Sequence, residues 1–273
     1  MVTVSIVTYK HELKDIIHTI QCVLECNRIS GLIIVDNSPT DKLKYDLDKT
    51  KIDYFFNNYN LGYGAAHNVA IKKSIERNIN YHLVLNPDVW FKPGTLEKLI
   101  EFMENNPDVG NVLPKVLYPD GSTQFLCKLL PTPNDWIGRR FNLFRKRVNK
   151  RNELFELRFT DYNKAMDVPY LSGCFMFLRV ESLEKIGLFD EKIFMYGEET
   201  DLCRRLIAGG YRTIFYPEAE ITHEFQKGSH KSFRFTWIGI KSAIYYFNKW
   251  GWFFDKERRE INKKTLGSLG NGI

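Results

Sequence analysis

The stretch YHLVLNPDVWFKPG places a carboxylate, Asp88, where a near-continuous apolar run ends. Its neighbours Asn86 and the rigid Pro87 would direct the side chain toward a cleft. Hard divalent cations such as Mg²⁺ or Mn²⁺ prefer carboxylate oxygens and substrate phosphates, so Asp88 is a candidate metal ligand. Asn-Pro-Asp is also a common turn sequence, so the motif alone leaves a plain turn open.

A second acidic feature lies in FMYGEETDL, where Glu198, Glu199 and Asp201 crowd the predicted start of a helix. The helix dipole favours acids at this end, so a charged cap is one explanation. Three carboxylates in four residues exceed what a cap requires, and their repulsion should raise at least one pKa. Such a group can serve as a general base near neutral pH.

Two further segments have weaker signals. His223 closes an apolar run, and Lys227 and Ser229 follow in a basic, hydroxyl-bearing stretch that suits a diphosphate. A lone histidine is more often an ordinary surface or core residue, but this context makes metal ligation plausible. In NLGYGAAHNVAI, Gly62 and Gly64 permit close backbone approach to another group, yet the third glycine of a dinucleotide fingerprint is missing.

Short apolar strands alternate with helix patterns over the first 120 residues. This alternation predicts an α/β fold, a mostly parallel sheet with helices on both faces. Ligands of such sheets bind beyond the carboxyl ends of the strands, which is where Asp36 and Asp88 fall. The predicted strands are 2–9, 31–38, 51–58 and 81–86, and the predicted helices are 13–24, 64–76 and 92–107.

The 273 residues suffice for one large domain, and the net charge is +6. Five cysteines without a CxxC pair are typical of reduced core thiols in a cytosolic protein. No signal-peptide pattern opens the sequence and no apolar run approaches about 20 residues, so we expect neither classical export nor an integral membrane protein. We predict one domain over 1–230, with a mobile basic loop at about 129–152, and a helical tail over 231–273.

Six motifs stand in an order that resembles the family-2 inverting glycosyltransferases of the GT-A fold, over roughly residues 2–230. Within that family the chain is most similar to the bacterial rhamnosyltransferases of polysaccharide and O-antigen assembly. Galactofuranosyl and other hexosyl transferases share most of these motifs. The motifs are VSIVTYK, IIVDNS, NLGYGAAHNVAI, LVLNPDV, LSGCFMFLRVESLEKIGLFDEKIFMYGEETDLCRRL and ITHE.

The resemblance implies a role for each motif. Asp88 would end the DxD-like motif and ligate a divalent cation, Mg²⁺ or Mn²⁺, that bridges the donor phosphates. Asn86 stands where many members have the first Asp, and His223 matches the C-terminal histidine ligand. Asp36 would bind the pyrimidine base and Thr8 the nucleoside. Further donor-binding residues would be Asn60, Gly62, Asn68, Asn86, Lys227 and Ser229.

The resemblance also implies the catalytic base. Glu198 and Glu199 fall on the family's Glu-Asp pair, whose second member removes the acceptor proton. Here that member is Glu199, one methylene longer than the usual Asp, and Asp201 is the alternative. A single displacement would invert the anomeric configuration.

The tail KSFRFTWIGIKSAIYYFNKWGWFFDKERREINKK is both aromatic and basic. One interpretation is a C-terminal helix that packs on the domain with a solvated basic face, and another is an interfacial helix on an anionic leaflet. The second places the protein in the cytoplasm, peripherally on the inner face of the membrane, with a polyprenyl-diphosphate-linked saccharide acceptor. No recognised nucleic-acid module is present, so we expect no nucleic-acid partner.

Three functional hypotheses remain open at this level. The first is transfer of L-rhamnose from deoxythymidine-diphosphate (dTDP) rhamnose. The second is the same chemistry with a UDP-hexose or UDP-galactofuranose donor, since thymine and uracil present nearly the same edge. The third is a catalytically silent membrane-bound scaffold, against which the intact acidic cluster and Asp88 argue.

Overall fold

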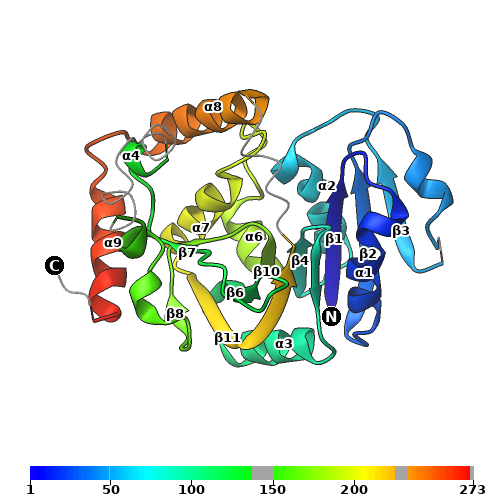
Figure 1. Ribbon diagram of the computed structural model, residues 1–273, viewed down its shortest axis with the longest axis horizontal. Coiled ribbons are helices and arrows are strands. Elements are labelled where there is room, and N and C mark those ends of the chain that lie inside the picture. The colour runs from blue at the N-terminus through cyan, green and yellow to red at the C-terminus, as the bar shows by residue number, and fades with distance from the viewer. Residues whose placement is uncertain (49, 137–150, 225–232, 271–273) are drawn as a thin grey trace.

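The computed structural model describes residues 1–48, 50–136, 151–224 and 233–270 (Figure 1). The strands are β1 Val2–Thr8, β2 Ile29–Asp36, β3 Ile52–Phe56, β4 Tyr81–Leu85, β5 Val89–Phe91, β6 Val109–Leu117, β7 Cys127–Lys128, β8 Met166–Asp167, β9 Tyr170–Leu171, β10 Phe175–Arg179 and β11 Arg212–His223. The helices are α1 Leu13–Leu24, α2 Tyr63–Glu76, α3 Thr95–Asn105, α4 Pro133–Trp136, α6 Val180–Ile186, α7 Glu198–Ala208, α8 Phe233–Trp250 and α9 Lys256–Ser268, with 3-10 turns at Lys42–Tyr45 and Arg158–Thr160.

Within the described ranges, the main sheet has the order β3-β2-β1-β4-β10-β6-β11-β5, and β8 pairs with β11. Strands β1 to β4 are mutually parallel, and β6 is parallel to β11. Strand β10 runs antiparallel to both β4 and β6, and β5 runs antiparallel to β11. The prediction of a mostly parallel sheet is confirmed, with β5, β8 and β10 running against the others.

Helices cover both faces of this sheet. In β2, Ile33 and Val35 pack with Ala66 and Ala70 of α2. The alternate residues of β2 belong to the larger core cluster, which also contains Ile16 of α1. Successive side chains of a strand point to opposite faces, so α1 and α2 lie on opposite sides of the sheet.

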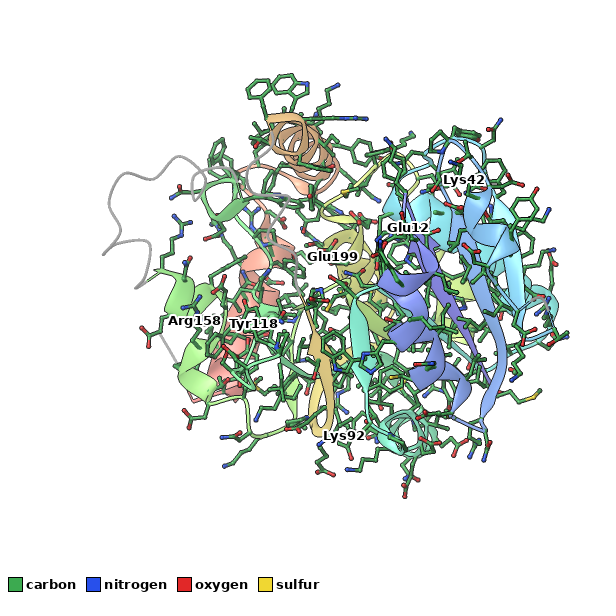
Figure 2. All side chains as sticks on the ribbon, turned by 45° about the vertical axis from the view of Figure 1, so that its right-hand side comes forward. Glu12, Lys42, Lys92, Tyr118, Arg158 and Glu199 are labelled. Atoms are coloured by element: carbon green, nitrogen blue, oxygen red, sulfur yellow. The ribbon has the colours of Figure 1, made fainter. Side chains whose placement is uncertain are left out.

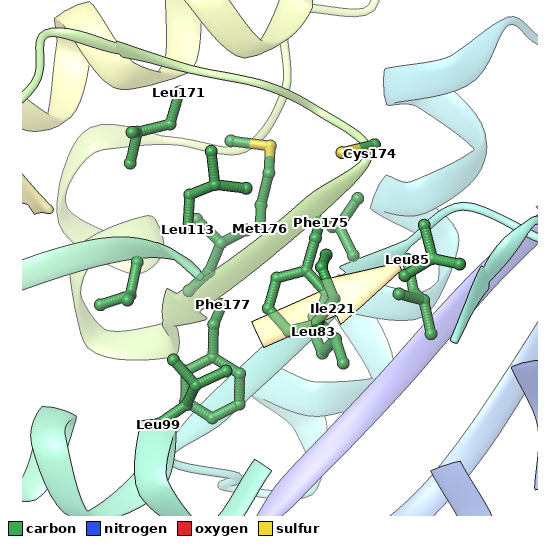
Figure 3. Packing of buried hydrophobic residues seen from close by; sticks show 14 of the residues in the cluster. Leu83, Leu85, Leu99, Leu113, Leu171, Cys174, Phe175, Met176, Phe177 and Ile221 are labelled. Atoms are coloured by element: carbon green, nitrogen blue, oxygen red, sulfur yellow. The ribbon is translucent and has the colours of Figure 1, made fainter. Parts of the chain in front are cut away.

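Strand β10 brings the C-terminal half of the chain into the middle of the sheet. Its residues Phe175 and Phe177 pair with Leu85 and Leu83 of β4, and all four are buried. Figure 3 shows these side chains together in the core, with Cys174 just before β10 begins. This insertion places the segment before β10 beside the Asn-Pro-Asp turn, because Asn86 N donates to the Cys174 carbonyl at 2.9 Å.

The C-terminal region is helical, as predicted, and consists of two helices, α8 and α9. The buried face of α8 is formed by Gly239, Ser242, Ala243, Tyr246 and Phe247. Other aromatic and aliphatic side chains of the region remain exposed, among them Phe233, Trp237, Ile244, Phe253 and Phe254. In the part of the chain that is described, no helix has the length and apolarity to cross a bilayer. All five cysteines are free and buried.

Candidate active site

The predicted metal ligands Asp88 and His223 meet at one edge of the sheet. Asp88 immediately precedes β5, and His223 ends β11 in register with Val89 of β5. His223 Nε2 lies 3.4 Å from Asp88 Oδ1. On its other side the imidazole is held by Gln124, whose Oε1 lies 3.0 Å from His223 Nδ1 and whose amide donates to the His223 carbonyl at 2.7 Å.

The charges of this pair stabilise each other. Burial disfavours the charged imidazole, but Cys174 and Asp88 outweigh that effect and raise the pKa of His223 to about 10. Burial likewise disfavours the Asp88 carboxylate, yet His223 lowers the pKa of Asp88 below its ordinary value. Asp88 therefore favours a positive charge beside it, which a divalent cation held by Asp88 and the neutral imidazole of His223 would supply in place of the proton.

The two side chains suit a divalent cation. Asp88 Oδ1 is buried and has no hydrogen-bond partner among the described residues. A carboxylate oxygen and an imidazole nitrogen facing each other are donors that Mn²⁺ accepts, and the oxygen also suits Mg²⁺. The described residues contain no cluster of three or more His, Cys, Asp or Glu suited to a metal ion. Asp88 and His223 would thus supply part of a coordination shell that substrate phosphates and water complete.

Tyr63, at the start of α2, connects this corner to the acidic pair. Its hydroxyl lies 3.0 Å from Asn86 Oδ1 and 2.6 Å from the Gly173 carbonyl oxygen. A Cβ atom on Gly173 would lie 3.5 Å from Glu199 Cβ and 3.7 Å from the Tyr63 ring. Burial, followed by the charges of Cys174, Glu198, Glu199 and Asp88, raises the pKa of Tyr63 well above its ordinary value. The Asn-Pro-Asp motif and the acidic pair therefore flank one site.

The two glutamates differ in environment. Glu199 Oε1 accepts from the Tyr170 hydroxyl at 3.1 Å, and Oε2 accepts from Gly197 N at 3.0 Å. The Glu198 side chain is buried, and its Oε2 has no hydrogen-bond partner in the described structure. Burial, reinforced by the charge of Glu199, raises the pKa of Glu198 well above its ordinary value. Burial thus favours the protonated form of Glu198, whereas Glu199 is held by two donors that orient it. Figure 2 shows Glu199 near the middle of the molecule.

Asp201, the alternative base, has a different position and role. Its side chain is fully buried and accepts from Arg205 Nε at 2.8 Å and Trp250 Nε1 at 2.7 Å. Lys249 Nζ lies 2.8 Å from the same carboxylate. Residues two apart on a helix point in directions about 200° apart, so Asp201 faces α8 while Glu199 faces the site. The structure therefore disagrees with the prediction of Asp201 as a base.

Asp36 and Thr8 lie at the carboxyl ends of neighbouring strands, as predicted. Asp36 is buried, with Oδ1 accepting from Ser38 N at 2.9 Å and Oδ2 from the Tyr54 hydroxyl at 2.7 Å. Thr8 Oγ1 is buried and has no hydrogen-bond partner within the described ranges. The ends of β1 and β2 thus present the Asp36 carboxylate in a fixed orientation. Beside it is the Thr8 hydroxyl, which has no hydrogen-bond partner among the described residues and could bind a ligand.

The loop before α2 is shaped by Asn60 and Gly62. Asn60 Oδ1 accepts from Gly62 N at 2.9 Å and lies 3.2 Å from Asn37 Nδ2. Gly62 has φ +91°, and a Cβ atom there would lie 2.2 Å from the Phe194 carbonyl oxygen. The close approach predicted for this glycine is therefore to the segment before α7, whose Phe194 carbonyl also accepts from Tyr63 N.

Asn68 does not line the site, in contrast to the prediction. Its Nδ2 donates to the Phe189 carbonyl at 2.9 Å, and its Oδ1 accepts from Phe189 N at 3.0 Å. The side chain is buried, so it ties α2 to the segment after α6. Lys227, Ser229 and most of the basic loop, residues 137–150, lie outside the described residues.

Several residues of the site carry no strong sequence signal. Gln124 lies in an irregular stretch, and Tyr54 is one aromatic residue among several in its strand. Tyr63 and Gly173 belong to quoted motifs, but nothing in the spacing indicates that one hydroxyl reaches both Asn86 and the Gly173 carbonyl. Tyr170 could have been noticed only from its place before the LSGC motif.

Comparison with known proteins identifies the family of this chain. Residues 3–187 match the family described as glycosyl transferase family 2. An N-acetylglucosaminyl-diphospho-decaprenol L-rhamnosyltransferase of Mycobacterium tuberculosis is 29% identical over 177 residues, which are 60% of this chain and 56% of that protein. The chain thus spans little more than half of that relative. Rhamnosyltransferase WbbL of Escherichia coli is 26% identical over 258 residues, covering 90% of this chain and 92% of that protein.

Solved structures with the same fold are distant in sequence. GalNAc-T7 with UDP, GalNAc and Mn²⁺ superposes with a TM-score of 0.61 at 14% identity, covering 82% of this chain and 43% of that one. The Pyrobaculum calidifontis mannosyltransferase PcManGT with GDP-Man and Mn²⁺ gives a TM-score of 0.54 at 16% identity, covering 98% and 74%. The GT-A fold and the likeness to bacterial rhamnosyltransferases are confirmed. The chain belongs to glycosyl transferase family 2.

Proposed function

We propose that the protein is an inverting, metal-dependent rhamnosyltransferase of cell-surface polysaccharide synthesis. It would move L-rhamnose from dTDP-L-rhamnose to a polyprenyl-diphosphate-linked saccharide. One observation carries the proposal: Asp88 Oδ1, which is buried and accepts no hydrogen bond within the described residues, faces His223 at 3.4 Å in the same site as Glu199. The names of the mycobacterial and Escherichia coli relatives support rhamnose as the sugar and, for the first, a lipid diphosphate as the acceptor anchor.

In this proposal each residue has one chemical role. Asp88 and His223 would hold a divalent cation, Mg²⁺ or Mn²⁺, and its positive charge would stabilise the leaving diphosphate. Asp36 and Thr8 bind the nucleoside at the ends of β2 and β1, and Asn86, oriented by Tyr63, contacts the donor. Lys227 and Ser229 stay assigned to the diphosphate by sequence alone.

The transfer itself rests on Glu199. Its carboxylate accepts the proton of the acceptor hydroxyl while that oxygen attacks the anomeric carbon. The bond between the anomeric carbon and the diphosphate oxygen breaks on the opposite face, so one displacement inverts the configuration. Tyr170 and Gly197 N hold the carboxylate in place for this step. A positioned base contributes about 10²–10⁴-fold to the rate.

We place the protein on the inner face of the cytoplasmic membrane. The support is the exposed aromatic and basic surface of α8 and of the turn before α9, where Phe253 and Phe254 are exposed. Each Lys or Arg near an anionic leaflet contributes about 1 kcal/mol to association. Several such residues would hold the protein reversibly at a surface where a lipid-linked acceptor resides.

Thermal unfolding with a panel of nucleotides tests the proposal. We expect dTDP with Mn²⁺ to stabilise the protein more than UDP, GDP or CDP does. At 100 times its dissociation constant, dTDP should raise the free energy of unfolding by about 2.7 kcal/mol relative to the ligand-free protein. A preference for UDP would move the donor to a UDP-hexose or UDP-galactofuranose and leave the site unchanged. A protein that no nucleotide stabilises would be the silent scaffold. Transfer of rhamnose to a GlcNAc-diphosphate-polyprenol is the matching activity assay.

A further inference from the structure

A groove of about 630 Å³ lies between α8 and the segment that precedes α7. Its volume falls within the range of small-molecule sites in proteins. Three cations and four large apolar side chains contribute to its lining, and no acid does. The lining residues are Lys192, Phe194, Phe233, Arg234, Trp237, Ile238, Lys241 and Ser242.

Among the described residues, no acid pairs with the cations of this groove. In the described part of the chain, neither Lys192 nor Arg234 has an acidic partner, and Lys241 lies over the Trp237 ring at 5.9 Å. The nearby carboxylate of Asp190 is engaged by Lys249 Nζ and the Tyr245 hydroxyl, at 2.8 and 2.9 Å. The groove therefore presents net positive charge.

The apolar side chains of the groove are unusually open to solvent. Phe233 is 86% exposed and Trp237 is 52% exposed, although both lie on a helix whose opposite face is buried. Aromatic rings beside cations that have no acidic partner in the described residues match a ligand with an apolar chain and an anionic head, rather than a free sugar or a free phosphate.

The wall of the groove reaches the candidate active site. Ser242 Oγ donates to the Met195 carbonyl at 2.7 Å, and Tyr63 N donates to the Phe194 carbonyl at 2.9 Å. The pair Phe194–Met195 thus has α8 on one side and the start of α2 on the other. Glu198 begins α7 three residues later, and Figure 1 shows α8 above α7. A ligand in the groove would lie against the segment that leads to the acidic pair.

From this placement we propose that the groove binds the lipid diphosphate of the acceptor. Lys192, Arg234 and Lys241 neutralise the diphosphate, while Phe233 and Trp237 contact the first isoprene units. This inference rests on the proposed function, because it assigns the lipid end of the same acceptor. It commits to the acceptor's own diphosphate, in contrast to general attraction to an anionic leaflet.

Calorimetric titration with farnesyl diphosphate, in EDTA to keep the metal corner empty, tests the inference. We expect farnesyl diphosphate to bind more tightly than farnesol or inorganic diphosphate. Lys192→Glu and Arg234→Glu should each weaken its binding about tenfold, as loss of one charge-assisted contact would, and Trp237→Ala should weaken it too. Lys263→Glu, an exposed basic position on α9, is the matched control and should change the affinity less than twofold.

Three results would overturn the inference: no binding of farnesyl diphosphate by the unaltered protein, equal weakening by Lys263→Glu, or unchanged affinity in the groove variants. Phosphatidylglycerol vesicles give a separate reading, because groove variants that lose only vesicle binding would make this a general membrane contact. Stabilisation of each variant by dTDP with Mn²⁺ reports folding and the donor site. Failure of the proposed function would therefore appear in that measurement, and failure of the groove in the titration.

Discussion

The indole nitrogen of Trp250 donates a 2.7 Å hydrogen bond to Asp201 Oδ1, which joins the C-terminal helix α8 to the helix that begins with the acidic pair. Helix α7 is also joined to the start of α9. Its Arg204 donates through two nitrogens to the carboxylate of Asp255, the N-cap of α9, at 2.6 and 2.7 Å. The Arg204 guanidinium also lies 4.2 Å from the centre of the Trp250 ring. The tail is thus part of the framework that fixes α7.

Trp250→Phe should destabilise the protein. The change keeps a ring over Arg204 but removes the indole donor from a fully buried carboxylate, which costs about 1–3 kcal/mol. Urea denaturation measures the loss. Trp252→Phe is the matched control, since its indole donates to Asn248 in an exposed setting and its loss should cost under about 0.5 kcal/mol. Equal losses in the two variants would contradict a structural role for the Trp250–Asp201 contact.

Gly62→Ala tests the close approach between the loop before α2 and Phe194. The new Cβ would lie 2.2 Å from the Phe194 carbonyl oxygen, at a φ of +91°, so a loss above about 3 kcal/mol is expected. Gly94→Ala is the matched control because its φ is +87° and nothing lies within 4 Å of the added atom. That variant should lose only about 1–2 kcal/mol of stability, the cost of placing a side chain in the left-handed region. Similar losses in a denaturation experiment would show that the contact is unimportant.

Asp88→Asn should remove the metal-dependent part of nucleotide binding. An amide keeps the shape but carries no charge for the cation, so the stabilisation by dTDP with Mn²⁺ should fall to that seen with EDTA. Thermal unfolding with and without Mn²⁺ measures it. Asp108→Asn, a half-exposed carboxylate paired with Arg212 at the start of β6, should keep the full shift. An undiminished Mn²⁺ effect in Asp88→Asn would remove Asp88 from the metal site.

Glu198 predicts a particular dependence of stability on pH. Its folded pKa is raised by burial, so the folded state holds the proton more tightly than the unfolded chain. The stability that the folded state gains from this proton is fully present below the unfolded pKa of about 4.3. It is lost as the pH rises toward the folded pKa of Glu198. Glu198→Gln, which mimics the protonated acid, should therefore gain stability relative to the unaltered protein between pH 5 and pH 8.

Urea denaturation at pH 5 and at pH 8 measures how much more stable Glu198→Gln is than the unaltered protein. The exposed Glu181→Gln on α6 serves as the control and should show a difference that is independent of pH. Parallel pH profiles for Glu198→Gln and the unaltered protein would contradict a buried, protonated Glu198.

Much of the framework could be read from the sequence. The predicted helix over 64–76 is observed as Tyr63–Glu76, and Thr8, Asp36 and Asn86 fall at strand ends because apolar runs stop where a strand leaves the core. The direction of β10 could not be predicted, since a strand buried on both faces looks the same in a parallel and an antiparallel sheet. The partners of Asp201 were likewise hidden, because Trp250 is far away in the sequence and only the folded tail brings it near.

The pairing of Asp88 with His223 could be predicted only from the family resemblance. Asp88 and His223 are distant in the sequence, so their proximity followed from the family resemblance and not from spacing. Asn68 belongs to the same quoted motif as Gly62, yet its side chain turns into the protein to bind Phe189. A motif thus indicates which segment borders a site, whereas the direction of each side chain depends on packing that only the structure gives.

The central claim is that Glu199 is the base of a metal-dependent sugar transfer, and the most direct test is the transfer rate of Glu199→Gln. The amide keeps the size of the side chain and cannot accept the proton, so the rate of rhamnose transfer to GlcNAc-diphosphate-polyprenol should fall about 10²–10⁴-fold. Stabilisation by dTDP with Mn²⁺ should stay as in the unaltered protein. A Glu199→Gln variant that transfers rhamnose at a near-normal rate would contradict the account.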